Sequence, residues 1–182
     1  QLDNVTIGAF KKLNPDALIA VDATSSMAGV ALDFTNADIW FASVQKCFGL
    51  PAGMALMICS SRAVKSALEL NQNKHYNSLT LLIEKMKDYQ TSYTPNVLLI
   101  FLLMRTLEVS DNIIDVDRRI TNQFIKWSAF IDKTQGFDFL IKNESVRSKT
   151  VIPLSSSEFD ISQIKLEAIK AGNYVTWPWL TT

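Results

Sequence analysis

The sequence lacks the charge imbalance and the long apolar segments that mark several common functional classes. Its 182 residues carry eighteen basic and eighteen acidic side chains, so the net charge is zero. Nothing therefore predicts a nucleic-acid or acidic-membrane partner. The longest apolar run, Val97–Met104, is too short to cross a bilayer. A packed core helix is its simplest interpretation.

Cysteine and histidine are also scarce. Cys47 and Cys59 are the only two cysteines and fit no metal-ligand spacing, so no metal site is expected. Two cysteines without a signal peptide suggest a reducing compartment, and we expect a cytoplasmic protein. His75, the one histidine, lies in a polar segment without a partner in view. It is more simply explained as solvated than as catalytic.

What the sequence does contain is typical of a globular domain, with 48% apolar and 20% charged residues. The chain starts at Gln1 rather than at methionine, and it stops in mid-pattern at Trp177–Thr182. We therefore expect a fragment, with segments missing on both sides.

The first part of the chain has the pattern of an α/β sheet. Short apolar runs bounded by turn signals predict three strands: Ala17–Val21, Ile39–Ala42 and Met54–Cys59. The first run is continuously apolar, which suits a parallel strand buried on both faces. Ser60 and Ser61 are candidate N-caps for a helix over residues 62–70. Gln1–Phe10 has a weak pattern and predicts a loop.

The next segments are mainly helical. Leu79–Lys87 is either a short helix or a strand followed by a loop. Thr94 as N-cap and Pro95 at the first helical position predict a largely buried helix over Val97–Val109. A helix start of this kind can hold a phosphate, although an ordinary capped helix explains it as well. Ser110–Asp111 should cap another helix, whose apolar stripe extends to Ile131.

Near residue 130 the pattern changes. Phe137–Ile141 and Thr150–Leu154 predict two strands, and Asp160–Ala171 predicts an amphipathic helix that ends before Gly172. We therefore expect residues 1–130 to form part of a large domain. Residues 131–182 should begin a small α+β domain at the C-terminal side.

Two polar groups stand at strand ends where ligands bind in α/β sheets. Asp22 follows the first predicted strand, and Lys46 lies in a polar turn after the second. A buried carboxylate and a lysine amine are the pair that binds pyridoxal phosphate, one at the ring nitrogen and one at the aldehyde. Taken alone this pair is weak evidence, because such aspartates commonly cap helices and turn lysines are usually solvated.

The flanking motifs strengthen this interpretation. Val21-Asp-Ala-Thr-Ser-Ser26 and Ala42-Ser-Val-Gln-Lys-Cys-Phe-Gly-Leu-Pro-Ala-Gly53 resemble the cofactor-lysine region of class V aminotransferases, most of all the phosphoserine aminotransferase branch. The resemblance implies fold type I, with a mostly parallel sheet flanked by helices and a small C-terminal domain. It also implies transamination of a phosphoserine-like amino acid with pyridoxal 5'-phosphate.

The resemblance also assigns roles to single residues. It implies that Lys46 is the Schiff-base lysine and that Asp22 pairs with the pyridinium nitrogen. It implies that Thr24 lies against the ring and that Gln45 hydrogen-bonds the phosphate. Arg147 matches no family motif, so we expect a surface residue there.

Tyr93-Thr-Pro-Asn96 is similar to the Asn-Thr-Pro-Pro of that branch, with Tyr93 in place of the asparagine. In the family this segment reaches the cofactor phosphate of the other subunit, which implies a homodimer with Tyr93 and Thr94 at the shared site. Motifs that flank this region in the family are absent, so the isolated chain should be inactive.

Two alternatives stay open. One is a desulfurase or lyase on the same fold, although such relatives usually have histidine where this chain has Gln45. The other is a non-catalytic α/β fragment in which Lys46 is only a solvated turn residue.

Overall fold

The structure is a computed structural model that describes residues 3–173. The chain divides into two compact units, residues 1–120 and residues 121–182. The predicted division into residues 1–130 and 131–182 places the boundary later, near the end of the long helix α5 (Ile113–Lys133), and it stays a prediction. Residues 1–2 and 174–182 of the chain lie outside its described part.

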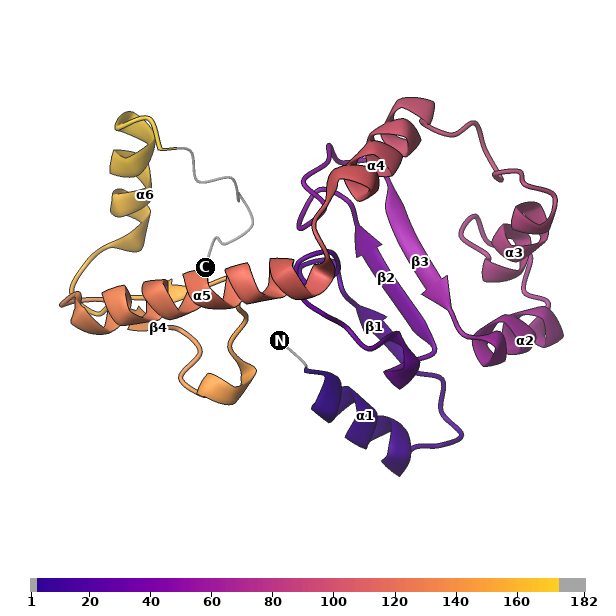
Figure 1. Cartoon of the computed structure of the whole chain (residues 1–182), viewed down its shortest axis with the longest axis horizontal. Helices are drawn as coiled ribbons and strands as arrows, with labels where there is room; N and C mark the ends of the chain where they lie inside the picture. The colour runs from indigo at the N-terminus through magenta and orange to yellow at the C-terminus, as the bar shows by residue number, and fades with distance from the viewer. Residues whose placement is uncertain (1–2, 174–182) are drawn as a thin grey trace. The chain divides into compact units, whose positions relative to one another are not determined.

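The first unit is built on a three-stranded sheet with the order β1-β2-β3 (Figure 1). β1 (Ala20–Asp22) pairs in parallel with β2 (Ile39–Ser43), and β3 (Ala55–Cys59) runs antiparallel to β2. All three predicted strands are confirmed, and β1 is shorter and starts later than expected. Its predicted burial on both faces is wrong, because Ala20 and Asp22 are exposed. Only one strand pairs with β1 in the described residues.

The core of this unit gathers around β2. Trp40 and Ala42 point to its buried side with 1% and 0% exposure, while Phe41 between them is exposed, as the alternation of a strand requires. The indole Nε1 of Trp40 donates a hydrogen bond to the carbonyl of Phe34 at 3.1 Å, in the short helical turn η1 (Phe34–Asn36). The other buried residues of this core cluster are Ile7, Ile19, Ala23, Met27, Ala37, Val44 and Phe48.

The segment predicted to be an N-terminal loop is a helix, α1 (Asn4–Leu13). The carboxylate of Asp3 caps it by accepting a hydrogen bond from the amide of Thr6 at 2.7 Å. Ile7 is its one buried residue, whereas Val5, Phe10 and Leu13 are exposed, so its apolar residues do not mark one buried face. The loop prediction is therefore wrong, because one cap and one anchoring side chain suffice beside the sheet.

The next two helices have serine caps. Ser60 caps α2 (Ser61–Leu70), as predicted, and Ser78 caps α3 (Leu79–Lys87). The sequence left two alternatives for Leu79–Lys87, a short helix or a strand followed by a loop, and the structure shows the helix. His75 lies between the two helices and is exposed, in agreement with its simpler interpretation.

Helix α4 (Val97–Val109) is present, but two expectations about it are wrong. Its N-cap is Asn96, whose side chain accepts a hydrogen bond from the amide of Leu99 at 3.1 Å, so Thr94 and Pro95 precede the cap. The helix is also not largely buried, because Leu99 is its one buried residue. Large apolar side chains on its other faces are 45–73% exposed: Val97, Leu98, Ile100, Phe101, Met104, Leu107 and Val109.

The start of α5 differs from the prediction in a similar way. The side chain of Asn112 accepts a hydrogen bond from the amide of Ile114 at 2.9 Å, so the capping group lies one residue beyond the predicted Ser110–Asp111. No helix of residues 3–173 has the length and apolar character needed to cross a membrane.

The second unit contains a small antiparallel pair and a helix. β4 (Asp138–Phe139) pairs with β5 (Leu154–Ser155), the short helical turn η2 (Glu144–Val146) lies between them, and α6 (Ile161–Lys170) follows with Asp160 as its cap. The predicted strands and helix are thus confirmed in type, although the strands are shorter.

Arg147 in this second unit is not the surface residue that we expected. Its side chain is only 15% exposed. The guanidinium carbon lies 3.9 Å from the centroid of the Phe139 ring, and Nε donates to the carbonyl of Ile141 at 2.8 Å. Arg147 therefore stabilises the chain between β4 and β5, a role for which a guanidinium's planar stacking face and several donors are suited.

Candidate active site

Two loops meet at one edge of the sheet because β1 and β2 are parallel and end side by side. Asp22 closes β1 opposite Phe41 of β2. Directly beyond this pair, the amide of Ala23 donates to the carbonyl of Phe41 at 2.8 Å. The amide of Ser43, the last residue of β2, donates to the hydroxyl oxygen of Thr24 at 3.3 Å. The loop after Asp22 is thus held against the start of the turn that contains Lys46.

Asp22 begins its loop with a local hydrogen bond. Its Oδ1 accepts from the amide of Thr24 at 2.9 Å, the two-residue pattern that aspartate commonly makes in turns. Asp22 is exposed and Thr24 is half-buried. We expected Asp22 to be buried, but the described residues do not shield it from water. Only β2 pairs with β1, so the other edge of β1 is open in the described residues.

The Lys46 turn is anchored by its neighbours. Val44 is fully buried, its amide donates to the carbonyl of Met54 at 3.1 Å, and its carbonyl accepts from the amide of Leu50 at 3.2 Å. The amide of Gly49 donates to the carbonyl of Lys46 at 2.9 Å. Gly49 has φ +69°, a left-handed conformation that glycine adopts without strain. Within this fixed turn Lys46 is half-buried.

Cys47 provides a further link between the two loops. Its Sγ donates to the carbonyl of Ser25 at 3.4 Å. A Cβ placed on Gly29 would lie 2.9 Å from the same sulfur, so the first loop passes too closely for a larger residue. Burial raises the pKa of the Cys47 thiol, and the nearby charge of Lys46 opposes this only in part. The thiol is therefore protonated at neutral pH and acts as a packing group.

Taken together, the two loops present groups of complementary chemistry at one sheet edge. They are the carboxylate of Asp22, the hydroxyl of Thr24, the amide of Gln45 and the amine of Lys46, of which Asp22 and Gln45 are exposed. A carboxylate suits a pyridinium nitrogen, an amine suits an aldehyde, and hydroxyl and amide groups suit a phosphate. This donor set fits pyridoxal phosphate.

Tyr93 and Thr94 lie in the segment between α3 and α4. The Tyr93 ring, 53% exposed, stacks on that of Tyr76 with centroids 4.6 Å apart, and its carbonyl accepts from the Thr91 hydroxyl at 2.6 Å. Thr94 is exposed. The contacts described for Tyr93 are with Tyr76 and Thr91 of the same chain, and the cross-subunit role of the segment stays a prediction.

The chain matches no protein-family model. It is 31% identical over 105 residues to an uncharacterized aminotransferase of Helicobacter pylori, an alignment that covers 58% of this chain and 28% of that protein. It is 29% identical over 97 residues to the phosphoserine aminotransferase of Rhodococcus opacus. This alignment covers 51% of this chain and 26% of that protein.

A solved structure extends the likeness to nearly the whole chain. The phosphoserine aminotransferase of Cytophaga hutchinsonii superposes with a TM-score of 0.81 at 30% identity, over 94% of this chain and 49% of that one. The predicted resemblance is therefore confirmed. The chain is similar to phosphoserine aminotransferases. Its α/β fold is the aminotransferase fold, as predicted.

The chain spans about half the length of the aminotransferase structure that it matches, and about a quarter of the two sequence relatives in alignment. The likeness shows the fold of this portion. The roles of Asp22, Thr24, Gln45, Lys46, Tyr93 and Thr94 stay predictions, supported by the meeting of the two loops described above.

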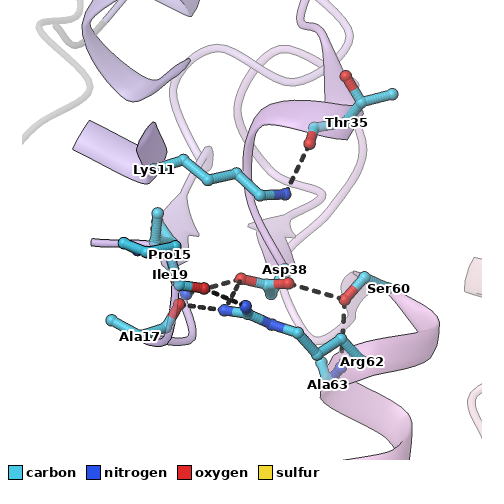
Figure 2. A network of polar contacts seen from close by, with 9 residues as sticks. All are labelled: Lys11, Pro15, Ala17, Ile19, Thr35, Asp38, Ser60, Arg62 and Ala63. Atoms are coloured by element: carbon cyan, nitrogen blue, oxygen red, sulfur yellow. Dashed lines mark hydrogen bonds and ion pairs between the residues drawn. The ribbon is translucent and has the colours of Figure 1, made fainter. Parts of the chain in front are cut away.

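One polar cluster escaped the sequence analysis. Asp38, just before β2, is 2% exposed, and its Oδ2 accepts from the amide of Ile19 at 3.0 Å and from Nη2 of Arg62 at 3.3 Å (Figure 2). Its Oδ1 accepts from the hydroxyl of Ser60 at 3.0 Å. The sequence signal was an aspartate directly before an apolar strand, which alone is indistinguishable from a loop residue.

These contacts predict acid-sensitive stability. Burial by itself raises the pKa of Asp38, but the bonds from Ile19 and Ser60 and the charge of Arg62 outweigh it, so the pKa lies below its usual value. The resulting stabilisation is complete above the unfolded-state pKa of about 3.9 and is lost as the pH falls through the lower folded-state pKa. We expect Asp38→Asn to lower the free energy of unfolding of the full-length protein by about 1–3 kcal/mol at neutral pH.

Urea unfolding at pH 7 and at pH 3 measures this effect. The difference between wild type and Asp38→Asn should shrink at the lower pH, because wild-type Asp38 is then becoming protonated as well. Asp88→Asn, which removes an exposed carboxylate in the same unit, is the control for a general charge effect. A difference that is equal at both pH values would contradict the assigned ionisation.

Proposed function

We propose that this chain is part of a class V, pyridoxal-phosphate-dependent aminotransferase that acts on a phosphoserine-like amino acid. One observation carries the proposal: the loops after the parallel strands β1 and β2 are hydrogen-bonded to each other. The amide of Ser43 donates to the hydroxyl of Thr24, and the thiol of Cys47 donates to the carbonyl of Ser25. This places the segments that contain Asp22 and Lys46 at one sheet edge. The phosphoserine aminotransferases among its relatives support the same chemistry.

In this function Lys46 would hold the cofactor and would move the α-proton of the substrate as a base and an acid. Asp22 would hold the proton on the ring nitrogen, Thr24 would contact the ring, and Gln45 would bind the phosphate. When bound, pyridoxal phosphate supplies an electron sink for negative charge at the α-carbon. Because the chain spans about half of the related structure, we expect residues 1–182 alone to lack turnover.

The experiment that tests the proposal maps the site of cofactor attachment. Full-length protein is incubated with pyridoxal phosphate at equal concentration, reduced with borohydride, digested and analysed by mass spectrometry. We expect the added pyridoxyl mass on the peptide that contains Lys46. Modification spread over exposed lysines such as Lys12 and Lys65, with Lys46 unmodified, would contradict the proposal.

The proposal includes a homodimer in which Tyr93 and Thr94 bind the cofactor phosphate of the other subunit. Their exposure in this chain supports such a role. It also includes a cytoplasmic location, with which the free thiols of Cys47 and Cys59 agree.

Replacement of Thr94 tests the shared site. We expect Thr94→Val to weaken pyridoxal-phosphate binding by roughly tenfold or more, since a hydrogen bond to a charged phosphate is lost. Mixed dimers with a Lys46→Ala subunit should regain one site of wild-type affinity, because that site combines Lys46 of one subunit with Thr94 of the other. Absence of this recovery in fluorescence titrations would place Thr94 in its own subunit's site or in none.

A further inference from the structure

The end of the sheet opposite the candidate active site is held by main-chain bonds around Asp38. Its amide donates to the carbonyl of Ile19 at 2.8 Å, and its own carbonyl accepts from the amide of Ser60 at 2.7 Å. With the side-chain bonds from Ile19 and Ser60, each of these two residues contacts Asp38 twice. Asp38 therefore links the start of β1, the start of β2 and the end of β3.

Arg62 extends this link to the segment that leads into β1. Its guanidinium donates to the main-chain carbonyls of Pro15 and Ala17 and contacts Oδ2 of Asp38 at 3.3 Å (Figure 2). Lys11 at the end of α1 donates to the carbonyl of Thr35 at 2.9 Å. A planar guanidinium with several donors can hold carbonyls and a carboxylate at once, which a single ammonium group cannot do.

We call the contacts of Asp38 and Arg62 with the segment before β1 the clamp. The clamp matters because β1 is short. A strand of three residues has few ladder bonds with which to fix its register on β2. In the observed register Ala20 lies opposite Ile39 and Asp22 opposite Phe41. A shift of one residue would turn every side chain of the strand to the other face and move Asp22 relative to the Lys46 turn.

We propose that Asp38 is a positioning residue for the active site: by binding the amide of Ile19 it fixes the register of β1 on β2, and thereby the placement of Asp22 beside the Lys46 turn. The effect on the active site rests on the proposed function, whereas the effect on the register of β1 is a property of the sheet itself. Asp38 is distant from the reacting groups along both strands. It acts only through the backbone that it holds.

The test uses Asp38→Asn in the full-length protein, well below its unfolding temperature. Asparagine keeps the shape, but it removes the negative charge that strengthens the bonds from the amide of Ile19 and from Arg62. Hydrogen exchange at residues 20–22 and 39–41 should become faster by roughly tenfold, the scale on which a charge-assisted hydrogen bond exceeds a neutral one. The absorption maximum of bound pyridoxal phosphate and its pH dependence should also shift, because the charge of Asp22 moves relative to the ring.

Ile83→Ala is the matched control, because Ile83 is a buried residue of α3 outside the clamp. It should lower the unfolding temperature but leave both the absorption of the bound cofactor and the exchange of β1 as in wild type. If Asp38→Asn fails to fold, Arg62→Lys, which keeps the charge but loses the fork, should give the same two changes to a smaller extent.

The outcomes separate the clamp from the proposed function. Exchange of β1 that is unchanged in the folded Asp38 and Arg62 variants overturns the clamp. Faster exchange with unchanged absorption also overturns the positioning role, since Asp38 would then affect only stability. If wild type binds no pyridoxal phosphate at Lys46, the proposed function and this role fail together, while the exchange result still decides whether Asp38 sets the register.

Discussion

Full-length protein that carries Lys46→Ala is expected to lose transamination turnover by roughly 10⁴-fold or more, the scale observed when a side chain that acts in the chemical step is removed. Alanine can neither hold the cofactor covalently nor move the α-proton. The loss should lie in kcat, because the groups that bind the substrate are unchanged. Steady-state kinetics with an amino donor and a keto acid measure it.

The position of Lys46 makes a folding defect an unsuitable explanation for such a loss. The turn is held by Val44, which is fully buried, and by main-chain bonds to Gly49, Leu50 and Met54 that alanine at position 46 leaves in place. We expect the free energy of unfolding to change by no more than about 1 kcal/mol.

A control and a rescue define this prediction further. Lys65→Ala removes a lysine whose side chain is 78% exposed and should leave turnover unchanged. A small primary amine added in solution should restore part of the turnover of Lys46→Ala, because it can carry the proton in place of the missing side chain. Wild-type kcat in the Lys46 variant would remove the basis of the proposed function.

The parts of this fold that could be predicted are those fixed by local sequence. The strands β1, β2 and β3 were predicted because each is a short apolar run between turn signals, and the cap at Ser60 because this polar residue precedes an amphipathic helix. Helix α1 was missed because its apolar residues mark no single buried face: Ile7 is buried, whereas Val5, Phe10 and Leu13 are exposed.

The candidate site was predictable for a similar reason. Parallel strands that are neighbours end at one edge, so Asp22 and the Lys46 turn were expected together once β1 and β2 were identified. The Asp38 cluster was not predictable, because it joins residues 19, 38, 60 and 62, which meet only after the sheet forms. The burial of α4 was wrongly expected, since apolar composition alone does not show which faces are covered.

Replacement of Asp22 is expected to have the second large effect on turnover. Two variants separate the charge of Asp22 from its hydrogen bond within the turn. Asp22→Asn keeps an oxygen that can accept the hydrogen bond from the amide of Thr24, but it removes the negative charge. Asp22→Ala removes both. If the carboxylate holds the ring nitrogen protonated, both variants should lose turnover to a similar extent, by roughly 10²-fold or more, the scale of one positioned acid–base group.

Asp33→Asn is the matched control for the turn contact. Its Oδ1 accepts from the amide of Thr35 at 3.0 Å, the same two-residue pattern as Asp22 with Thr24, and it is the N-cap of η1 rather than part of the candidate site. This variant should keep wild-type turnover. All three variants should still attach pyridoxal phosphate at Lys46, because attachment needs the amine and not the carboxylate.

The comparison between the two Asp22 variants decides the role of this residue. Equal losses of kcat mean that charge is what turnover needs, since asparagine preserves the turn. Near-normal turnover in Asp22→Asn combined with slow turnover in Asp22→Ala would show that Asp22 serves only to shape the loop. The exposure of Asp22 in this chain makes the outcome informative, because a carboxylate open to water interacts weakly with a pyridinium ion. A large effect of Asp22→Asn in the full-length protein would therefore require a drier site around Asp22 than these residues provide.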